Sequence, residues 1–138
     1  MDQELLLKMI IDTAPIRIFW KDLNGVYLGC NKALLDDLKL KEESDLVGKT
    51  DYDMVWKDFA DLYRKDDKEV MDSGKPKLNY IEKVTRVDNQ TVVVSTSKVP
   101  LKGSGGDIIG ILGVYEDITQ EYEAKKKIKE HEKFMIVQ

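Results

Sequence analysis

The residues of this chain that could carry out nucleophilic, acid–base or metal chemistry are few and far apart. The only cysteine is Cys30 and the only histidine is His131. A single thiol cannot form an intrachain disulfide or a zinc site built on several thiolates, and a single imidazole cannot form a multi-histidine metal site. Since no Ser-His-Asp, Cys-His or metal-ligand pattern is present, we expect neither catalytic residues nor a metal site here.

Two charged residues, Glu82 and Lys98, lie inside strand-like runs. If the turn at residues 88–91 is tight, the predicted hairpin places them nearly opposite each other on the inward face. Buried charges persist only when they are paired or bound to a ligand. The two residues are therefore either an ion pair at the rim of the sheet or a polar handle for a ligand carboxylate or amine. Asp51 and Asp53 present a similar choice, and capping of the following turn is favoured for both.

The first elements needed to position these residues are a helix and a hairpin. Residues 5–11 have apolar side chains at helical spacing and precede Pro15, which predicts an amphipathic helix outside the core. Residues 16–22 and 26–30 are strand-like, and the Asn24-Gly25 dipeptide between them is a strong hairpin signal. These two strands should pair antiparallel.

Helices and three longer strands follow. Asn31 can cap a helix that ends at Leu38, and a polar loop covers residues 39–53. A second helix is predicted over residues 57–73, with its apolar positions at Phe59, Leu62, Tyr63, Val70 and Met71. The remaining strand candidates are residues 78–87, 91–101 and 108–115. This order predicts an α+β domain built on one antiparallel sheet.

The composition sets limits on the class of protein. A length of 138 residues suffices for one domain with one core. Charged residues make up 35% of the chain with a net charge of −4, and both signs are interspersed, so we expect neither a nucleic-acid partner nor membrane contact. The apolar run at residues 5–11 is too short to span a bilayer and lacks the features of a signal peptide. We therefore expect a cytoplasmic protein, or the cytoplasmic piece of a longer one.

The chain changes from strand chemistry to helix chemistry at Asp117, Ile118 and Thr119. Both alternating faces of residues 108–115 are apolar, which predicts a strand buried on two sides. The side chain of Asp117 or Thr119 can cap the helix that follows. This helix either folds back on the domain or serves as a connector, and in the second case residues 117–119 form the signal relay.

Four stretches, in this order, resemble the PAS domain, the sensor module of bacterial signalling proteins. They read WKDLNGVYLGCN, VGKTDYD, SKVPL and GILGVYEDIT, and they span residues 19–119. The resemblance implies a five-stranded sheet in the spatial order 2-1-5-4-3 with helices over one face. It divides the chain into a flanking helix (1–14), a PAS sensor domain (15–119) and a connector helix (120–138).

Strand parity and this resemblance together predict a ligand pocket between sheet and helices, since residues two apart share a face. Gly113 would leave room for a ligand, and Tyr115 would offer a hydroxyl group. In the first strand, apolarity favours Ile16, Ile18 and Trp20 for the core, whereas the family pattern favours Phe19, which we retain. The predicted ligand-binding residues are Phe19, Leu34, Leu38, Asp51, Met54, Tyr63, Tyr80, Glu82, Val84, Val94, Thr96, Lys98, Ile111, Gly113 and Tyr115.

The resemblance also limits the cofactor. Asp51 stands where flavin photosensors of this family have their reactive cysteine, and His131 lies in the terminal helix rather than in the central helices that supply a haem ligand. We therefore expect neither covalent flavin nor haem, although an unidentified small-molecule ligand is compatible with the sequence. Cys30 is interpreted as a small core residue.

The terminal helix suggests a homodimer. Ala124, Ile128, His131 and Met135 form a short, imperfect a/d seam. The residues after His131 lack the Arg-Thr-Pro-Leu run of a phosphoacceptor motif, so His131 is not interpreted as a phosphorylation site.

Two functions remain open. The first is a sensory module that binds a small ligand and relays its presence through the C-terminal helix to an effector in the same chain. For that effector a histidine kinase of a two-component system comes first and a diguanylate cyclase second. The alternative is a ligand-free dimerisation or interaction module whose pocket is filled by its own side chains. An enzymatic domain is not expected.

Overall fold

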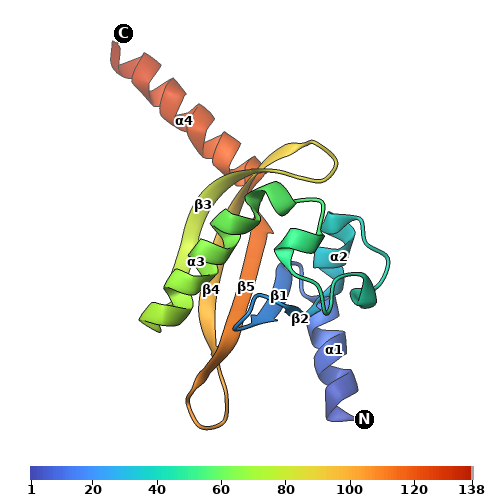
Figure 1. Cartoon of the computed structure of the whole chain (residues 1–138). Helices are drawn as coiled ribbons and strands as arrows, with labels where there is room; N and C mark the ends of the chain where they lie inside the picture. The colour runs from blue at the N-terminus through green and yellow to red at the C-terminus, as the bar shows by residue number, and fades with distance from the viewer. Residues whose placement is uncertain (138) are drawn as a thin grey trace.

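The computed structural model describes the backbone of residues 1–137 and the side chains of residues 1–133. The helices are α1 (Gln3–Thr13), α2 (Lys32–Leu38), α3 (Ala60–Ser73) and α4 (Thr119–Val137). The strands are β1 (Arg17–Asp22), β2 (Tyr27–Cys30), β3 (Lys77–Thr85), β4 (Thr91–Lys102) and β5 (Ile108–Asp117). Short 3-10 turns at Glu43–Asp45, Asp51–Asp53 and Lys57–Phe59 punctuate the long connection between α2 and α3 (Figure 1).

The five strands form one antiparallel sheet in the order β2-β1-β5-β4-β3, so the predicted fold class and strand order are confirmed. Local chemistry explains the first hairpin. Gly25 has a φ of 80°, which favours glycine, and the Asp22 carboxylate accepts the N–H groups of Asn24 and Val26. The turn thereby satisfies its own backbone donors and brings β1 and β2 together.

Helices α2 and α3 lie over one face of the sheet. Helices α1 and α4 extend from opposite ends of the molecule (Figure 1). The Asn31 side chain accepts the N–H of Leu34 at 3.2 Å, which confirms it as the cap of α2. Gly74, with a φ of 67°, ends α3. Ile109 of β5 is 47% exposed, so the prediction of a strand buried on both sides is wrong at the start of this strand.

The buried face of α3 matches the predicted one in the second half of the helix but not at its start. Phe59 and Leu62 are 56% and 61% exposed, whereas Asp67, Val70 and Met71 are buried. Val70 and Met71 pack with Ile111 of β5 in one hydrophobic cluster. Asp67, which the apolar pattern did not include in the buried face, forms the ion pairs described below.

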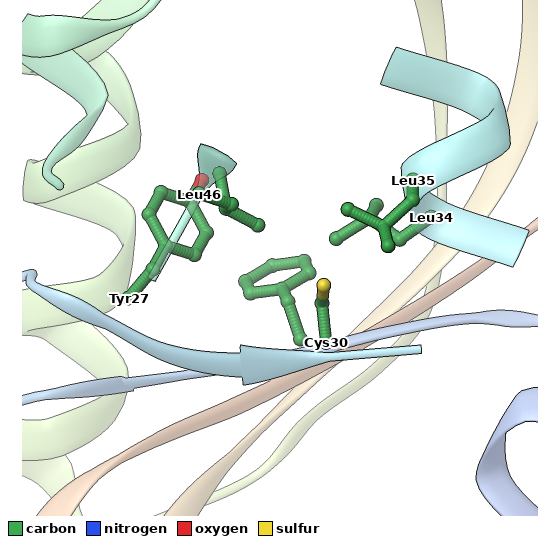
Figure 2. Packing of buried hydrophobic residues seen from close by; sticks show 6 residues of the cluster. Tyr27, Cys30, Leu34, Leu35 and Leu46 are labelled. Carbon is green, nitrogen blue, oxygen red and sulfur yellow. The ribbon is translucent and has the colours of Figure 1, made fainter. Parts of the chain in front are cut away.

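A second hydrophobic cluster joins β1 and β2 to α2 and the loop that follows it. In Figure 2 the side chains of Tyr27 and Cys30 point toward Leu34 and Leu46. Phe19 completes the cluster at 9% exposure, which confirms the family pattern for β1 over the apolar set. Cys30 is fully buried, as predicted for a core residue, and its burial raises the pKa of the thiol to about 11.

The opposite face of β1 carries Trp20, which is half-buried. A Cβ atom at Gly29 of β2 would lie 2.2 Å from the Trp20 ring, so the glycine leaves room for this indole. The apolarity of the alternate residues in β1 therefore serves packing on the face away from the helices.

Helix α1 has no buried residue, in agreement with its predicted place outside the core. It is attached by polar contacts. Lys8 donates to the Cys30 carbonyl oxygen at 3.0 Å and pairs with Glu43 at 3.1 Å, while Asn31 donates to the Ile11 carbonyl oxygen at 2.8 Å. The apolar face of α1 remains exposed, notably at Leu7, which is 60% exposed.

Candidate functional site

A cavity of about 190 Å³ lies between the sheet and the helices. Its middle is apolar. The aliphatic and aromatic lining residues are Phe19, Tyr27, Leu34, Leu38, Trp56, Tyr63, Val84, Val87, Val92, Val94 and Tyr115. Charged side chains form two groups along β4, one near Lys98 and the other near Val92. Each group connects the sheet to a different helix.

The first group, the lysine–aspartate ladder, consists of Lys21, Lys98, Asp51, Asp66 and Asp67. Lys21 Nζ donates to Asp51 Oδ2 at 2.8 Å and to Asp67 Oδ2 at 2.9 Å. Lys98 Nζ donates to Asp67 Oδ1 at 2.7 Å and lies 3.0 Å from Asp66 Oδ2. Both lysines are nearly fully buried, and Asp51 and Asp67 have no exposed surface. The ladder thus connects β1 and β4 to α3 through buried charges that alternate in sign.

The ladder is completed by neutral donors. Tyr27 and Trp56 donate to Asp51 Oδ1 at 2.6 and 2.8 Å. Burial alone would raise the pKa of Asp51, but the charge of Lys21 and these hydrogen bonds hold it below its usual value. Burial also opposes ionisation of Asp66, yet Lys98 and the hydrogen bond from Tyr80 lower its pKa. Asp51 and Asp66 are therefore held in their ionised form.

The predicted pairing of Glu82 with Lys98 is wrong. Thr85 pairs with Thr91 across the hairpin, and this register places Glu82 opposite Val94. Lys98 instead lies next to the aspartates of α3. Glu82 accepts a hydrogen bond from Thr96 Oγ1 at 3.2 Å.

The second group, the arginine cluster, consists of Arg17, Arg86, Asp37 and Tyr115. Both guanidinium groups approach Asp37 Oδ1 at 3.2 Å, and the Tyr115 hydroxyl donates to Asp37 Oδ2 at 2.9 Å. Burial and the charge of Asp37 raise the pKa of Tyr115, so its hydroxyl keeps its proton. The Nε atoms of both arginines are buried without a hydrogen-bond partner. This cluster joins α2 to β1, β5 and the turn between β3 and β4, but it leaves donors unsatisfied.

The start of α4 adjoins the arginine cluster. Asp117 lines the cavity, and its Oδ1 accepts the N–H and the hydroxyl of Thr119 at 2.9 and 2.6 Å. Val93 of β4 donates its N–H to Thr119 Oγ1 at 2.9 Å and accepts the N–H of Ile118 at 2.8 Å. Burial opposes ionisation of Asp117, but the Thr119 hydrogen bonds and the nearby arginines lower its pKa. The junction is therefore bonded both to a cavity wall and to the last helix.

Most of the predicted pocket residues line this cavity. These are Phe19, Leu34, Leu38, Tyr63, Glu82, Val84, Val94, Thr96, Lys98 and Tyr115. The residues on the strands share the face that parity predicted to be turned toward the helices. Leu34 and Leu38 come from α2 and Tyr63 comes from α3.

Five predicted pocket residues lie elsewhere. Capping was favoured for both Asp51 and Asp53. Only Asp53 caps a turn, by accepting the Thr50 N–H at 2.9 Å, whereas both oxygen atoms of Asp51 are engaged in the ladder. Met54 packs against the cluster around Phe19. Three others are used within the structure: the Tyr80 hydroxyl donates to Asp66, Ile111 is fully buried beneath α3, and the Phe19 ring fills the space above Gly113.

The sequence analysis missed several lining residues, chiefly Lys21, Asp37, Asp66, Arg86 and Asp117. One signal was available for Lys21, because it lies two residues after Phe19 and so shares its face. The same signal was available for Arg86 and Asp117, which lie two residues after the predicted pocket residues Val84 and Tyr115. Asp37 and Asp66 lie on helices, where strand parity gives no information.

A sequence profile described as PAS fold matches residues 11–123. The chain belongs to the PAS family. A PAS domain is a sensory module and not itself catalytic. Within residues 1–137, no helix combines the length and the apolar character that a membrane crossing requires.

Relatives of this PAS domain occur in signalling proteins. The chain is 28% identical over 132 residues to the methanogenesis regulatory histidine kinase FilI of Methanothrix harundinacea (strain 6Ac). The match covers 96% of this chain but only 15% of that kinase.

Solved structures show the same fold. The PAS domain of BvgS from Bordetella pertussis superposes with a TM-score of 0.60 at 25% identity, covering 96% of this chain and 99% of that one. The Vibrio cholera VqmA–ligand–DNA complex gives a TM-score of 0.75 at 25% identity, covering 83% of this chain and 51% of that one. VqmA bound to DPO gives 0.74 at 24% identity over 82% of this chain and 57% of that one.

Proposed function

We propose that this PAS domain binds a small molecule in the cavity and relays its presence through α4 to an effector domain that follows in the same chain. The observation that supports this proposal most directly is the position of Asp117. Its side chain lines the cavity and also accepts the N–H of Thr119 at the start of α4. A ligand that displaces this carboxylate would act on the helix without an intermediate element.

Strand β4 offers a second route. Val92 and Val94 line the cavity, and Val93 between them holds Ile118 and Thr119 by backbone hydrogen bonds. A ligand that shifts the two valines therefore shifts the anchor of the helix. The population of two helix positions can respond only as far as the ligand binds one of them more tightly.

The effector and the dimer belong to this proposal. The similarity to FilI favours a histidine kinase as effector. The exposed apolar residues Leu7 and Ile10 of α1 and Ile128 of α4 supply surface for a homodimer through the flanking helices. Ala124 and His131 of the predicted seam are exposed too, while Met135 lies outside the side chains that are described. A cytoplasmic location, without nucleic-acid or membrane contact by this segment, completes the proposal.

We expect neither haem nor covalent flavin in the proposed ligand site. Asp51 stands where flavin photosensors have their thiol, and both of its oxygens are engaged with Lys21, Tyr27 and Trp56. We expect no absorption band between roughly 400 and 450 nm to remain with the purified protein. A band that survives gel filtration would contradict this expectation.

The cavity proposal is tested by filling the cavity. Native mass spectrometry of the gently purified chain should show a bound small molecule that Val94→Phe lacks. Val114→Phe, on the face of the sheet away from the helices, is the matched control and should retain it. At a ligand concentration of about 100 times Kd, binding should also stabilise the folded domain by about 2.7 kcal/mol.

A specific observation favours the alternative, an interaction module without a ligand. The Phe19 ring already occupies the space that Gly113 leaves open. If neither bound mass nor ligand-dependent stabilisation is found, and Val94→Phe leaves output unchanged in the full-length protein, the cavity is a packing feature and the alternative holds.

A further inference from the structure

One carboxylate in the cavity wall, that of Glu82, has no cationic partner. Glu82 lies on the edge strand β3, faces the cavity and is exposed, so the cavity reaches solvent beside it. Among the described side chains, no lysine or arginine forms an ion pair with it. Its Oε2 accepts a hydrogen bond from the hydroxyl of Thr96, which is 5% exposed. The carboxylate is therefore held toward the cavity with acceptor capacity to spare.

The cations in the cavity wall, by contrast, are already engaged. Lys21 and Lys98 each contact two aspartates of the ladder. Arg86 pairs with Asp37 at 3.2 Å and with Asp88 at 3.6 Å. An anionic ligand would have to compete with these carboxylates for the same cations.

The balance of charge around the cavity is negative. Three basic side chains line it, Lys21, Arg86 and Lys98, against four acidic ones, Asp37, Asp66, Glu82 and Asp117. The residues that form ion pairs with this lining add two positive charges and three negative ones, from Arg17, Lys77, Asp51, Asp67 and Asp88. A carboxylate ligand would be repelled, whereas an ammonium group would be attracted.

Apolar surface adjoins the free carboxylate. Val94 lies directly opposite Glu82 in the hairpin, and Val84 follows Glu82 on the same face of β3. Tyr63 also lines the cavity, and its hydroxyl forms no hydrogen bond within residues 1–133. The cavity therefore offers an apolar wall beside Glu82 and a second acceptor on α3.

We propose that the cavity selects a small apolar molecule with a protonated amine, whose ammonium group pairs with Glu82 and whose apolar body packs against Val84 and Val94. This inference deepens the proposed function and rests on it, because it names the chemical class of the ligand. An apolar body suits the lining between the two charged groups, and a charge-assisted hydrogen bond gives the amine end its preference.

The test uses three probes of one shape that differ in charge: 2-phenylethylamine, propylbenzene and 3-phenylpropanoate. Each is titrated into the isotope-labelled chain of 138 residues while backbone amide signals are followed by NMR. The amine should bind at least about tenfold more tightly than the carboxylate, and Glu82→Gln should weaken the amine about tenfold while leaving propylbenzene within about twofold. Glu116→Gln, which removes an exposed carboxylate outside the cavity lining, is the matched control and should change none of the three affinities.

The outcomes separate this inference from the function on which it rests. If propylbenzene shifts cavity signals but the carboxylate binds as tightly as the amine, or Glu82→Gln leaves amine affinity unchanged, the amine preference is overturned and cavity binding stands. If none of the probes shifts signals of cavity residues, both proposals fail.

Discussion

The two charged groups that flank the cavity differ in how completely they are satisfied. In the lysine–aspartate ladder every carboxylate oxygen accepts at least one hydrogen bond or ion pair, and Lys21 and Asp67 are essentially inaccessible. In the arginine cluster two guanidinium groups converge on one oxygen of Asp37, and both arginine side chains remain 21% exposed. The first group can fix α3 to the sheet, whereas the second can rearrange at small cost.

This difference suggests that the two charged groups along β4 have different roles. A satisfied, buried network is expensive to disturb, because any lost partner leaves a charge in a medium of low dielectric constant. An over-supplied cluster has alternative pairings available, and Asp117, close to these arginines, is bonded to the start of α4. The proposed relay through α4 requires this combination: the ladder holds α3 in place, and the arginine cluster can rearrange beside the start of α4.

The largest effect is expected from Lys21→Met in the ladder. The ladder has three carboxylates and two ammonium groups, so loss of a lysine leaves Asp51 and Asp67 short of cations. We expect unfolding free energy to fall by about 3–5 kcal/mol in urea titrations. Asp67→Asn, which removes the excess negative charge, should cost less than Lys21→Met.

Lys83→Met on the exposed edge strand is the control for the loss of a lysine, since Lys83 forms no ion pair among the described side chains. It should change stability by less than about 0.5 kcal/mol. Equal costs for Lys21→Met and Lys83→Met would show that the ladder does not hold the fold.

The next effect is the response of stability to acid. The pKa values of Asp51 and Asp66 lie below their usual range, so their contribution is fully present above the unfolded pKa of about 3.9 and is lost as pH falls through the folded values. Lys98 has the opposite sign. Burial opposes its charge, but Asp67 and Asp66 raise its pKa, so its contribution is lost only as pH rises above about 10.4.

Stability from the ladder should therefore be flat from about pH 5 to 9 and fall steeply below about pH 4. Urea titrations across this range would measure it. In Lys21→Met the acid-dependent loss should shrink, because the cation that lowers the pKa of Asp51 is gone. An unchanged slope in that variant would show that other carboxylates cause the acid sensitivity.

A smaller effect on stability is expected where Asp117 meets α4. Thr119→Ala removes the hydroxyl that bonds Asp117 and Val93, and loss of such a capping contact costs about 1 kcal/mol. Stimulus dependence of the full-length protein should suffer far more than its melting temperature. Thr119→Ser keeps the hydroxyl and should behave as the wild type. If the melting temperature collapses, or if Asp117→Ala and Thr119→Ala both switch normally, the junction is structural only.

The smallest effect on stability is expected for Arg86→Gln. Because Arg17 also contacts Asp37, the carboxylate keeps one cation, and a partly exposed ion pair contributes less than about 1 kcal/mol. A calorimetric melt should detect a minor shift at most. A loss comparable with that of Lys21→Met would erase the distinction between the two charged groups.

Much of the fold followed from local patterns, and the charged contacts did not. The Asn24-Gly25 turn, the Asn31 cap and the alternation along β4 each depend on neighbours in sequence, so these elements and many lining residues were predictable. The strand order came from the resemblance to the PAS family. Lys21 and Asp67 are 46 positions apart, and no local pattern reports which helix residue will face a given strand. The same limit explains the error at Glu82, where parity located the face correctly but the hairpin register decided the partner.

The buried thiol of Cys30 has a practical consequence for measuring helix motion. With a pKa of about 11 in place of 9.0, Cys30 presents roughly a hundredfold less thiolate near pH 8 than an ordinary cysteine, and its side chain is inaccessible. A new cysteine at Ile128, on the exposed surface of α4, would react with a maleimide spin label or dye far faster than the native one. The wild-type background thus permits site-specific labelling, and in the proposed homodimer the distance between the two labelled α4 helices can be followed directly while a stimulus is applied.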